Sequence, residues 1–577
     1  MSRTPSYDAK IKVILDATQP GERVCSLLGD KWVLTQEEID WCRRLNVPPS
    51  SYSQRTRWVL MAHYTTGYQF WWNKHFETGV PVLSFHHPTS GVRVLPDAEW
   101  FNKDFSDISL EVDPAQSLFP QLRELQKKIP MIATSTIVPA VNSISLVSMG
   151  DQNCYFTLAC KAKNAYYSVL LIDGEECADM ITVNKSNQCW NMLHCDRMYR
   201  CLVARESFDC VDSAFLFDCR DCEYCFGATN KRRRKYLWWN EQLSKEEWEK
   251  RRVSVDLSSR RVLEEQFAKF ENLLQTETIW PENFNEKAID STGEYLTDCT
   301  NCRECFTLTE HSTDNYRCAY GHNTHGCFDC FGPFNATECY MSMTAANSTR
   351  LVGCWRTIGS DTCEYCITCY NCKNCFGCVG LQHKEFHIFN KPYSPGEYWR
   401  RVDELKCAML ERGEYGRFFL LSMATTYAPH GGSMLYCGAS LEEMKKLGAN
   451  MLEQCSDGAC GVETAGAAMK SPDEIPDKLD EVTDEWTRTP IFDTKANRKF
   501  AFLPAELELY RKLRLAPPKE HFISRVIELF RTMQGCGFEK RVCVACSAEV
   551  TISFNAKYPD RKVYCKKCYL EYLEKNG

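Results

Sequence analysis

A spacing of three residues is the clearest pattern of apolar positions along the chain. The eleven cysteines from Cys318 to Cys378 share one phase of this period, and so do the seven from Cys189 to Cys225. A period of three matches neither the 3.6 residues of an α-helix nor the 2.0 of a flat strand. It suits a β-solenoid, in which short straight segments and corners bring one side chain inward at a fixed step. Cysteine would serve there as a small buried apolar residue.

A second interpretation of the same cysteines stays open. The blocks 189–225 and 299–378 contain several CxxC pairs, and two thiolates three residues apart on a turn can form half of a tetrahedral zinc site. One local candidate site combines two thiols with two imidazoles. Its four residues are Cys318, His322, His325 and Cys327. Inward-facing thiols and multiple zinc sites are therefore both kept as alternatives.

The ends of the two cysteine blocks are related in sequence. Residues 218–227 align with 371–380, and residues 237–248 align with 388–398. Each copy predicts an apolar strand, an asparagine turn and a helix that begins at a Ser-x-x-Glu capping box. The helix after the first copy is expected to continue through an amphipathic stretch to Leu274. A helix in this position commonly caps a repeat array and covers an edge that would otherwise pair with another chain.

A second duplication relates the two ends of the chain. Residues 31–49 align with 499–518, and each copy predicts a short strand, a capped helix and a Pro-Pro stop. Downstream, the C-terminal copy carries the pattern CxxC-x18-CxxC. Its four cysteines are Cys543, Cys546, Cys565 and Cys568. Four thiolates from two turns make a closed, structural Zn²⁺ site that leaves no position for a substrate.

The N-terminal copy has no cysteines at the corresponding places, so its interior is expected to be filled by apolar side chains instead. The residues expected in this core are Trp71, Trp72, Phe85, Val92, Val94, Trp100 and Phe101. Because one copy dispenses with the metal, the zinc in the other copy is interpreted as structural.

These patterns predict an α+β, mostly β fold. A cysteine-rich, β-solenoid-like repeat region, interrupted by a helical insertion, is flanked by two related helix-plus-zinc-ribbon-like modules. The glycine- and alanine-rich residues 458–468 predict a loop. The expected segments are 1–130 (N-terminal ribbon-like module without metal ligands), 131–230 (first cysteine block), 231–290 (hairpin and helical insertion), 291–393 (second cysteine block), 394–487 (capping helix and linker) and 488–577 (C-terminal helix and four-cysteine zinc ribbon).

Composition narrows the class of protein. The chain has 577 residues, of which 44% are apolar and 25% charged, and this is ordinary globular usage. No run of 18 apolar residues predicts a membrane span, and the start of the chain lacks the apolar core of a signal peptide. The odd number of cysteines, 35, cannot pair completely within one chain. We therefore expect a reducing compartment, with the protein either cytoplasmic or virion-associated.

One segment has the composition of a nucleic-acid contact. Lys231, Arg232, Arg233, Arg234 and Lys235 precede Tyr236, Trp238 and Trp239, and basic charge next to aromatic rings is used for binding single strands. The alternative is a solvated hairpin. The net charge of −7 argues against a chain whose main task is to coat nucleic acid.

The sequence offers little support for catalysis. It contains no HExxH, GxSxG, P-loop or GxGxxG motif. The remaining candidates for acid–base chemistry, His63 and the pair His86-His87, are expected to be surface residues. The chain is therefore not expected to be an enzyme.

Several short motifs occur in a specific order along nearly the whole chain. They lie at residues 97–101, 372–381 with 384 and 388–390, 413–419, 506–510 with 517–518, and 563–569. Their order resembles a family of large, cysteine-rich proteins of unknown function with a C-terminal zinc ribbon, seen in candidate-phyla (Patescibacteria-like) bacteria and in environmental and viral genomes. This chain departs from the family at residues 491–495, where members usually carry a further cysteine pair.

The resemblance implies an architecture but no biochemistry. The function expected from all these patterns is a non-catalytic scaffold, stabilised by zinc, that presents a rigid repeat surface to a protein partner or to its own assembly. A nucleic-acid-binding zinc-ribbon protein and a structural component of a virion are the alternatives.

Overall fold

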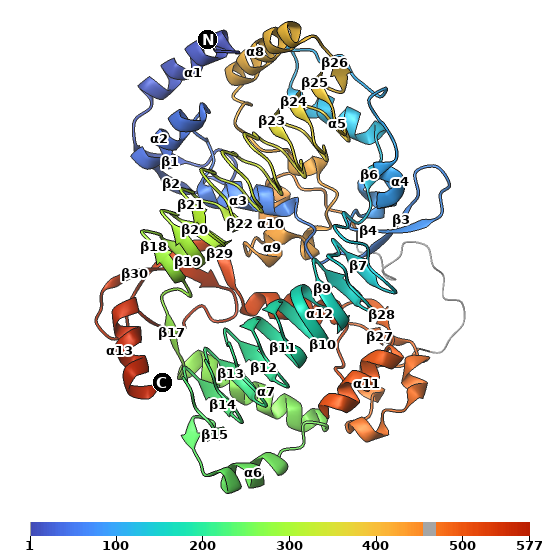
Figure 1. The fold of residues 1–577 in the computed structure, drawn as a ribbon, viewed down its shortest axis with the longest axis vertical. Coiled ribbons are helices and arrows are strands. Elements are labelled where there is room, and N and C mark those ends of the chain that lie inside the picture. Colours follow the sequence, from blue (N-terminus) through green and yellow to red (C-terminus); the bar gives the residue numbers. More distant parts are fainter. Residues whose placement is uncertain (1, 454–468) are drawn as a thin grey trace. The chain divides into compact units, whose positions relative to one another are not determined.

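The computed structural model describes residues 2–453 and 469–577 (Figure 1). The predicted loop at 458–468 lies outside these residues. The described chain combines helices with several β-sheets, in agreement with the expected mixture of α and β structure. It forms two compact units: one comprises Met1–Ala133, Asn283–Gln454 and Gly535–Phe538, and the other comprises Thr134–Glu282, Cys455–Gln534 and Glu539–Gly577. Each unit thus joins one end module of the chain to the cysteine block farther from it in sequence.

The second of these units is built on a ten-stranded sheet, which we call the first array (residues 134–242). Its strands follow chain order from one edge to the other. They are β7 (Ile144–Leu146), β8 (Tyr155–Leu158), β9 (Lys161–Tyr166), β10 (Val169–Asn184), β11 (Asn187–Asp196), β12 (Leu202–Arg205), β13 (Ala214–Phe217), β14 (Phe226–Thr229), β15 (Leu237–Trp238) and β16 (Glu241–Gln242).

From β11 to β14, successive strands of the first array pair in parallel at a constant offset. Trp190 pairs with Leu202, Leu202 with Ala214, and Ala214 with Phe226. Each partner therefore lies twelve residues further along the chain, the same separation that the bond from the Cys219 amide to Ser207 Oγ spans. Parallel neighbours only twelve residues apart leave no room for a crossover helix, so the chain must turn back within each interval.

The turns are made by residues with positive φ at every third position. Val203, Glu206, Asp209 and Asp212 all have φ between 47° and 56°. For residues other than glycine this left-handed conformation costs about 1–2 kcal/mol each, so the ladder hydrogen bonds and the buried interior must offset it. The sequence period of three corresponds to this corner spacing.

The cysteines occupy the inner position of each three-residue step. The Cys201 thiol donates to the carbonyl oxygens of Tyr199 and Cys210, at 3.4 and 3.3 Å. Ser207 sits in the same phase, and its hydroxyl donates to the Arg205 carbonyl at 2.9 Å. Thiols and small hydroxyls are thus interchangeable at this position, because both fill little space and can bond a backbone carbonyl.

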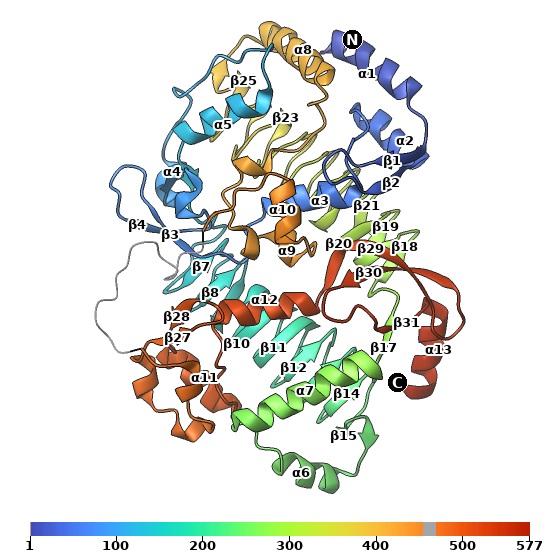
Figure 2. The same cartoon turned by 180° about the vertical axis from the view of Figure 1, so that it is seen from behind.

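Among the described residues, five α-helices belong to the same unit. They are α6 (Lys245–Val253), α7 (Arg260–Thr276), α11 (Pro504–Leu513), α12 (Phe522–Thr532) and α13 (Lys566–Asn576). Figure 2 shows α7 and α12 lying across the strands β10 to β13. The prediction of one continuous helix reaching Leu274 was wrong, because the structure has two helices, α6 and α7. The chain leaves the helix between them, where the Ser258 amide and hydroxyl both donate to the Asp256 carboxylate.

The shorter strands of this unit lie outside the first array. They are β17 (Ile279–Pro281), β27 (Ile491–Asp493), β28 (Arg498–Phe500), β30 (Glu549–Asn555) and β31 (Lys562–Tyr564). The strand β29 (Gln534–Val542) pairs with β30, and β17 pairs with β31.

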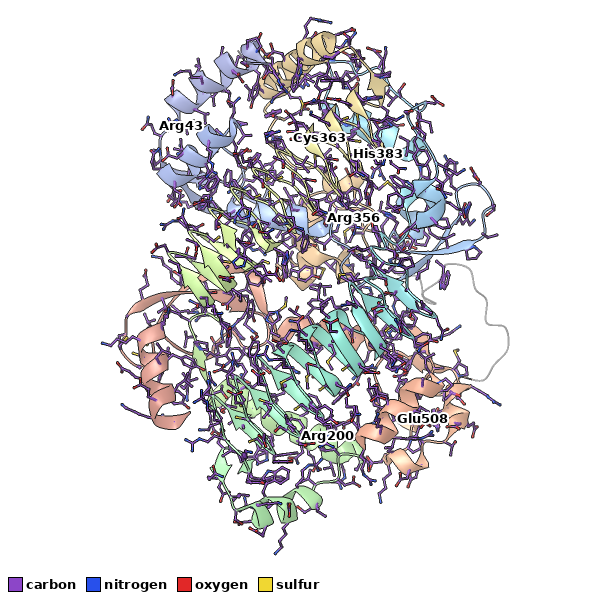
Figure 3. The ribbon with its side chains drawn as sticks, viewed as in Figure 1. Arg43, Arg200, Arg356, Cys363, His383 and Glu508 are labelled. Atoms are coloured by element: carbon purple, nitrogen blue, oxygen red, sulfur yellow. The ribbon has the colours of Figure 1, made fainter. Side chains whose placement is uncertain are left out.

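The other unit contains a second array (residues 283–392) with the same ladder. Asp361 pairs with Lys373 and Lys373 with Glu385, again in parallel, and the labelled Cys363 lies among its strands in Figure 3. The strands are β18 (Glu286–Ile289), β19 (Gly293–Thr300), β20 (Cys305–Thr309), β21 (Ser312–Thr313), β22 (Ala319–His322), β23 (Asp361–Glu364), β24 (Lys373–Phe376), β25 (Glu385–Ile388) and β26 (Lys391–Pro392).

The remaining elements of this unit surround the second array. The helices are α1 (Pro5–Ala17), α2 (Gln36–Leu45), α3 (Gln54–His63), α4 (Asp97–Phe101), α5 (Leu118–Lys128), α8 (Pro395–Glu411), α9 (Gly432–Leu435) and α10 (Leu441–Lys446). The short strands are β1 (Gly21–Val24), β2 (Lys31–Leu34), β3 (Trp71–Lys74), β4 (Pro81–Ser84), β5 (Val94–Leu95) and β6 (Met131–Ile132).

The two ends of the chain contain similar helix pairs. The pair α2–α3 matches α11–α12, and the first helix of each pair ends at a left-handed residue, Asn46 or Arg514. The predicted strands and helices of both copies are confirmed, because β2 precedes α2 and β28 precedes α11. In the N-terminal core, five of the seven expected side chains are buried, but Trp72 and Phe101 are each 41% exposed.

The last turn of each array shows which residues of the two cysteine blocks are structurally equivalent. A Cβ on Gly227 would lie 2.3 Å from the Trp239 ring, and a Cβ on Gly377 would lie 2.3 Å from the Phe389 ring. Both glycines have positive φ. Gly227 is therefore structurally equivalent to Gly377, one three-residue step before the Gly380 that the sequence alignment paired with it.

Candidate metal centre

The four cysteines of the CxxC-x18-CxxC pattern come together. Cys543 and Cys546 lie on the turn between β29 and β30, Cys565 is the residue before α13, and Cys568 lies in the first turn of that helix. Their sulfur atoms all lie within 4.8 Å of one another. In the described part of the chain, no other group of three or more His, Cys, Asp or Glu side chains brings its ligand atoms together in this way.

Backbone amides prepare this cluster for a cation. The Cys565 amide donates to Cys543 Sγ at 3.2 Å. Burial opposes ionisation of Cys543, but hydrogen bonds from the backbone amides of Cys565, Cys546 and Ala545 outweigh it and lower the pKa of this thiol to about 6. A thiolate is the form that binds metal, so the site can hold a metal ion with four sulfur ligands and leaves no open position.

The cluster also positions α13 against the first array. Tyr569, the residue after the last ligand, is 7% exposed, and its hydroxyl accepts a bond from the Asn230 amide at 2.9 Å and donates to the Asp218 carboxylate. Burial raises the pKa of Tyr569, which keeps the phenol protonated. A metal held by Cys565 and Cys568 would therefore fix the start of the helix that carries this contact.

The basic run 231–235 is largely paired. Arg232 binds the Asp218 carboxylate at 2.9 Å, and Lys235 binds Glu223 at 2.8 Å. Lys231 and Arg234 donate to the carbonyl oxygens of Asn576 and Gly577, at the C-terminal end of α13, where cations are favoured by the helix dipole. Arg233 is the exception: it is 86% exposed and lies 3.9 Å from Asp221.

The aromatic residues after this run also have partners within the array. Tyr236 stacks on Tyr224 with ring centroids 5.6 Å apart, and Trp238 stacks on Phe226 at 4.5 Å. The second stack joins β14 to β15, and both stacks connect successive turns of the array, so these rings pack on one another rather than standing free for bases.

The second candidate metal site is not brought together. Cys318 and Cys327 are fully buried at inner positions, where each thiol donates to backbone carbonyls. His322 and His325 occupy ladder positions instead, one bound to Glu310 at 3.1 Å and the other to Thr313 at 2.8 Å. The phase of three separates the thiols from the imidazoles, because inner and ladder positions face different ways.

The histidines expected on the surface are buried. His63, His86 and His87 have no exposed surface, so that expectation was wrong. His86 bonds Thr425 Oγ1 at 2.6 Å and the Ile132 carbonyl at 3.2 Å. Burial lowers the pKa of His63 to about 4 and, with a contribution from Arg356, that of His86 to about 3. The imidazoles of His63 and His86 are therefore neutral parts of a core.

Two features have no local sequence signal. The first is a buried ionic contact that fastens each helix pair to its array: Arg525 of α12 binds Asp179 at 3.1 Å, and Arg57 of α3 binds Asp329 at 2.8 Å. The second is a cavity beside Arg525. Both depend on residues more than a hundred positions apart, so no motif in the sequence indicates them.

No protein-family model, curated protein or solved structure matches the chain. Among the described residues, no helix combines the length and the apolar character needed to cross a membrane.

Proposed function

We propose that the protein is a non-catalytic scaffold made of two β-solenoid arrays, each capped by a helix pair and one of them also held by a zinc ribbon. The parallel ladders at twelve-residue offset support this proposal, because each coil contacts only its neighbours and the stack forms an extended, rigid surface. The buried, hydrogen-bonded thiols support it further. Burial raises the pKa of Cys195 and of Cys201 to about 12, so these two side chains are protonated and serve as packing.

Zinc is proposed as the ion of the four-cysteine cluster. Four thiolates and a closed, tetrahedral arrangement are typical of structural zinc. Such an ion contributes on the order of 10 kcal/mol to folding a small module. In this protein it would hold α13 in place and, through Tyr569, the C-terminal module on the first array.

Thiol labelling of the native protein tests this proposal. Cysteines would be alkylated before and after chelation and then located by mass spectrometry. The expected result is that chelation exposes Cys543, Cys546, Cys565 and Cys568, while the array cysteines stay reduced and unlabelled until the protein is unfolded. Array cysteines that become reactive on chelation alone would instead show that they are metal ligands.

Nucleic-acid binding is the second candidate, and it rests on the exposed Arg233 in the basic run. Because its neighbours are paired with acidic groups and with the end of α13, we expect no shift of labelled single-stranded DNA or RNA at physiological salt. A pull-down from native cells would complete the test: the scaffold proposal expects protein, and nucleic acid or virion components would favour the alternatives.

A further inference from the structure

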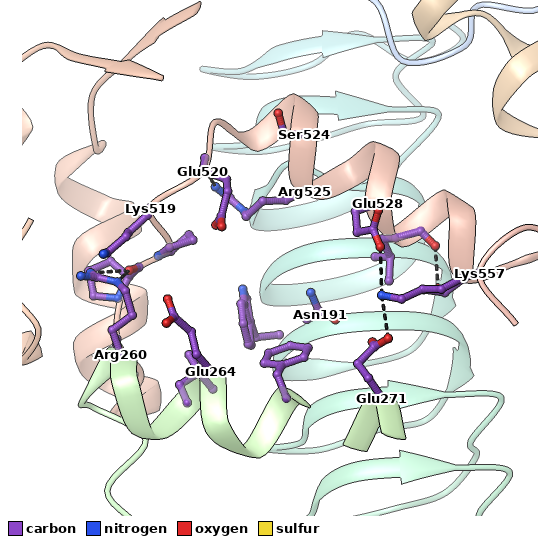
Figure 4. Close-up of a pocket in the computed structure, with 18 of the residues that line it drawn as sticks. Asn191, Arg260, Glu264, Glu271, Lys519, Glu520, Ser524, Arg525, Glu528 and Lys557 are labelled. Atoms are coloured by element: carbon purple, nitrogen blue, oxygen red, sulfur yellow. Dashed lines mark hydrogen bonds and ion pairs between the residues drawn. The ribbon is translucent and has the colours of Figure 1, made fainter. Parts of the chain in front are cut away.

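A cavity of about 490 Å³ lies within the unit that contains the first array. The array contributes Trp190, Asn191 and Arg205 to its walls, α7 contributes Arg260 and Phe267, and α12 lies on the opposite side (Figure 4). Small-molecule sites typically have volumes of about 300–1,000 Å³. The size of this cavity therefore suits a small organic ligand.

Arg205 places a buried positive charge in the cavity wall. Arg205 is only 5% exposed. Its guanidinium donates to the Asn191 carbonyl at 2.7 Å, to Asn191 Oδ1 at 2.6 Å and to the Ala204 carbonyl at 2.9 Å. All three acceptors are neutral. Burial lowers the pKa of Arg205, as expected for a cation whose surroundings do not compensate its desolvation.

Arg260 repeats this situation on the α7 side. It is 4% exposed and donates to the carbonyl oxygens of Pro476 at 2.9 Å and Pro517 at 2.7 Å. The other buried cation of the wall differs, because Arg525 has its own carboxylate in Asp179. Two guanidinium groups of the cavity are thus bonded to neutral oxygens alone.

No carboxylate bonds either guanidinium, although nearby acidic groups act on both through space and offset part of the cost of their burial. These groups are Glu206 and Glu271 for Arg205, and Glu264, Asp477 and Glu520 for Arg260. Lys557 already binds Glu271 at 2.7 Å and Glu528 at 2.9 Å. Glu264 and Glu520 are exposed residues, so water screens their charge. The buried part of the cavity therefore favours an anion.

The rest of the wall selects for an apolar body. The rings of Trp190 and Phe267 meet edge to face with centroids 5.7 Å apart, and this pair lines the cavity together with Leu263 and Leu529. Aromatic rings attract one another in offset-stacked or edge-to-face contacts, so these two rings favour a ligand that carries a third ring.

The equivalent place in the other helix–array contact is packed. Tyr340 follows Asp329 at the interval at which Trp190 follows Asp179, and Trp355 stands in the place of Arg205. Tyr340 and Trp355 are 1% and 2% exposed, and Trp355 packs on Tyr64 with ring centroids 4.9 Å apart. The N-terminal helix pair therefore packs on its array with an aromatic ring at the position that corresponds to Arg205, so packing alone does not require a guanidinium at this position.

We propose that this cavity binds a small organic anion, a carboxylate or a phosphate monoester, whose aromatic body lies against Trp190 and Phe267 and whose charge is held by Arg205 and Arg260. This function is separate from the scaffold role, and either could hold without the other.

Four matched probes test the proposal by isothermal titration calorimetry on the full chain. They are 3-phenylpropionate, phenyl phosphate, phenethylamine and 3-phenylpropanamide, each up to about 5 mM, the range of weak fragment affinities. We expect at least one of the two anions to bind, and neither the amine nor the amide. The anion that binds more tightly tells carboxylate from phosphate.

Three variants locate the binding. Arg205→Met should weaken the anion about tenfold or more, the value of one charge-assisted hydrogen bond. Ser524→Phe should fill the cavity from α12 and abolish binding even if Arg205→Met fails to fold. Arg233→Met, which removes an exposed cation from the same array, should leave the affinity unchanged. Binding of the amine or amide as tightly as the anions, full anion affinity in Ser524→Phe, or no binding of either anion would each overturn the proposal.

Discussion

Replacing Arg525 by methionine tests how the C-terminal helix pair is held on the first array. The guanidinium makes three contacts of 3.1–3.3 Å with the Asp179 carboxylate, and Asp179 is 1% exposed. In Arg525→Met this carboxylate keeps a single strong partner, the Trp190 indole N–H at 2.8 Å. An uncompensated buried charge costs about 3–5 kcal/mol.

Hydrogen exchange measured by mass spectrometry gives the local readout that a chain of two units requires. Amides of α12 and of β10 should exchange about a hundredfold to a few thousandfold faster in Arg525→Met, the equivalent of 3–5 kcal/mol. Adding Asp179→Asn removes the stranded charge and should bring exchange back to within about tenfold of the wild type.

A surface pair on the same array supplies the control. Lys161 and Asp173 lie 2.8 Å apart with side chains 59% and 46% exposed. Lys161→Met should change exchange by less than about fivefold, since exposed pairs contribute up to about 1 kcal/mol. If Arg525→Met behaves like Lys161→Met, or if Asp179→Asn fails to rescue it, the buried contact does not fasten the helix pair.

Three further predictions follow from single positions. The pKa of His63 lies near 4 in the folded protein, below its ordinary value. The stability that neutral His63 contributes is therefore fully present above about pH 6.5 and is lost, by about 3 kcal/mol, as the pH falls towards 4. Urea titrations across this range should show a smaller loss of stability in His63→Gln and an unchanged loss in His311→Gln, since the His311 side chain is 81% exposed. Gly227→Ala should lower the thermal midpoint more than Gly79→Ala, because both glycines have positive φ but only the first would press a Cβ against a ring. Cys201→Ser should alter the stability by no more than about 1 kcal/mol because a hydroxyl can keep the bond to the Tyr199 carbonyl, whereas Cys201→Leu should overpack the interior and unfold at clearly lower denaturant.

Local features could be predicted from the sequence because they depend on neighbouring residues. The capping serines are examples: Ser244 Oγ accepts from the Glu247 amide at 3.2 Å and Ser394 Oγ from the Glu397 amide at 3.4 Å. The four-cysteine cluster was predictable for the same reason, since two CxxC turns suffice to define it.

Features that depend on distant residues could not be predicted. Arg57 binds Glu38 of its own module and Asp329 of the second array. Nothing local to Arg57 indicates the second partner, so the sequence did not show which array each end module contacts. The burial of His86 likewise comes from Thr425 and Ile132, which lie far along the chain. The predicted metal site that included His322 was wrong for a different reason. The spacing of its residues along the sequence resembles that of zinc ligands, but the three-residue step places the thiols and the imidazoles on different faces of the array.

The number of zinc ions per chain tests the central claim most directly. Native mass spectrometry of the intact protein, with reduced thiols, should find one zinc ion per chain, and none in Cys568→Ser, which removes a ligand of the four-cysteine cluster. Such a result would mean that the cysteines of both arrays are buried thiols that fill the interior and bind no metal. About six or more ions per chain, or zinc retained in full by Cys568→Ser, would show that the arrays bind metal and would contradict the account.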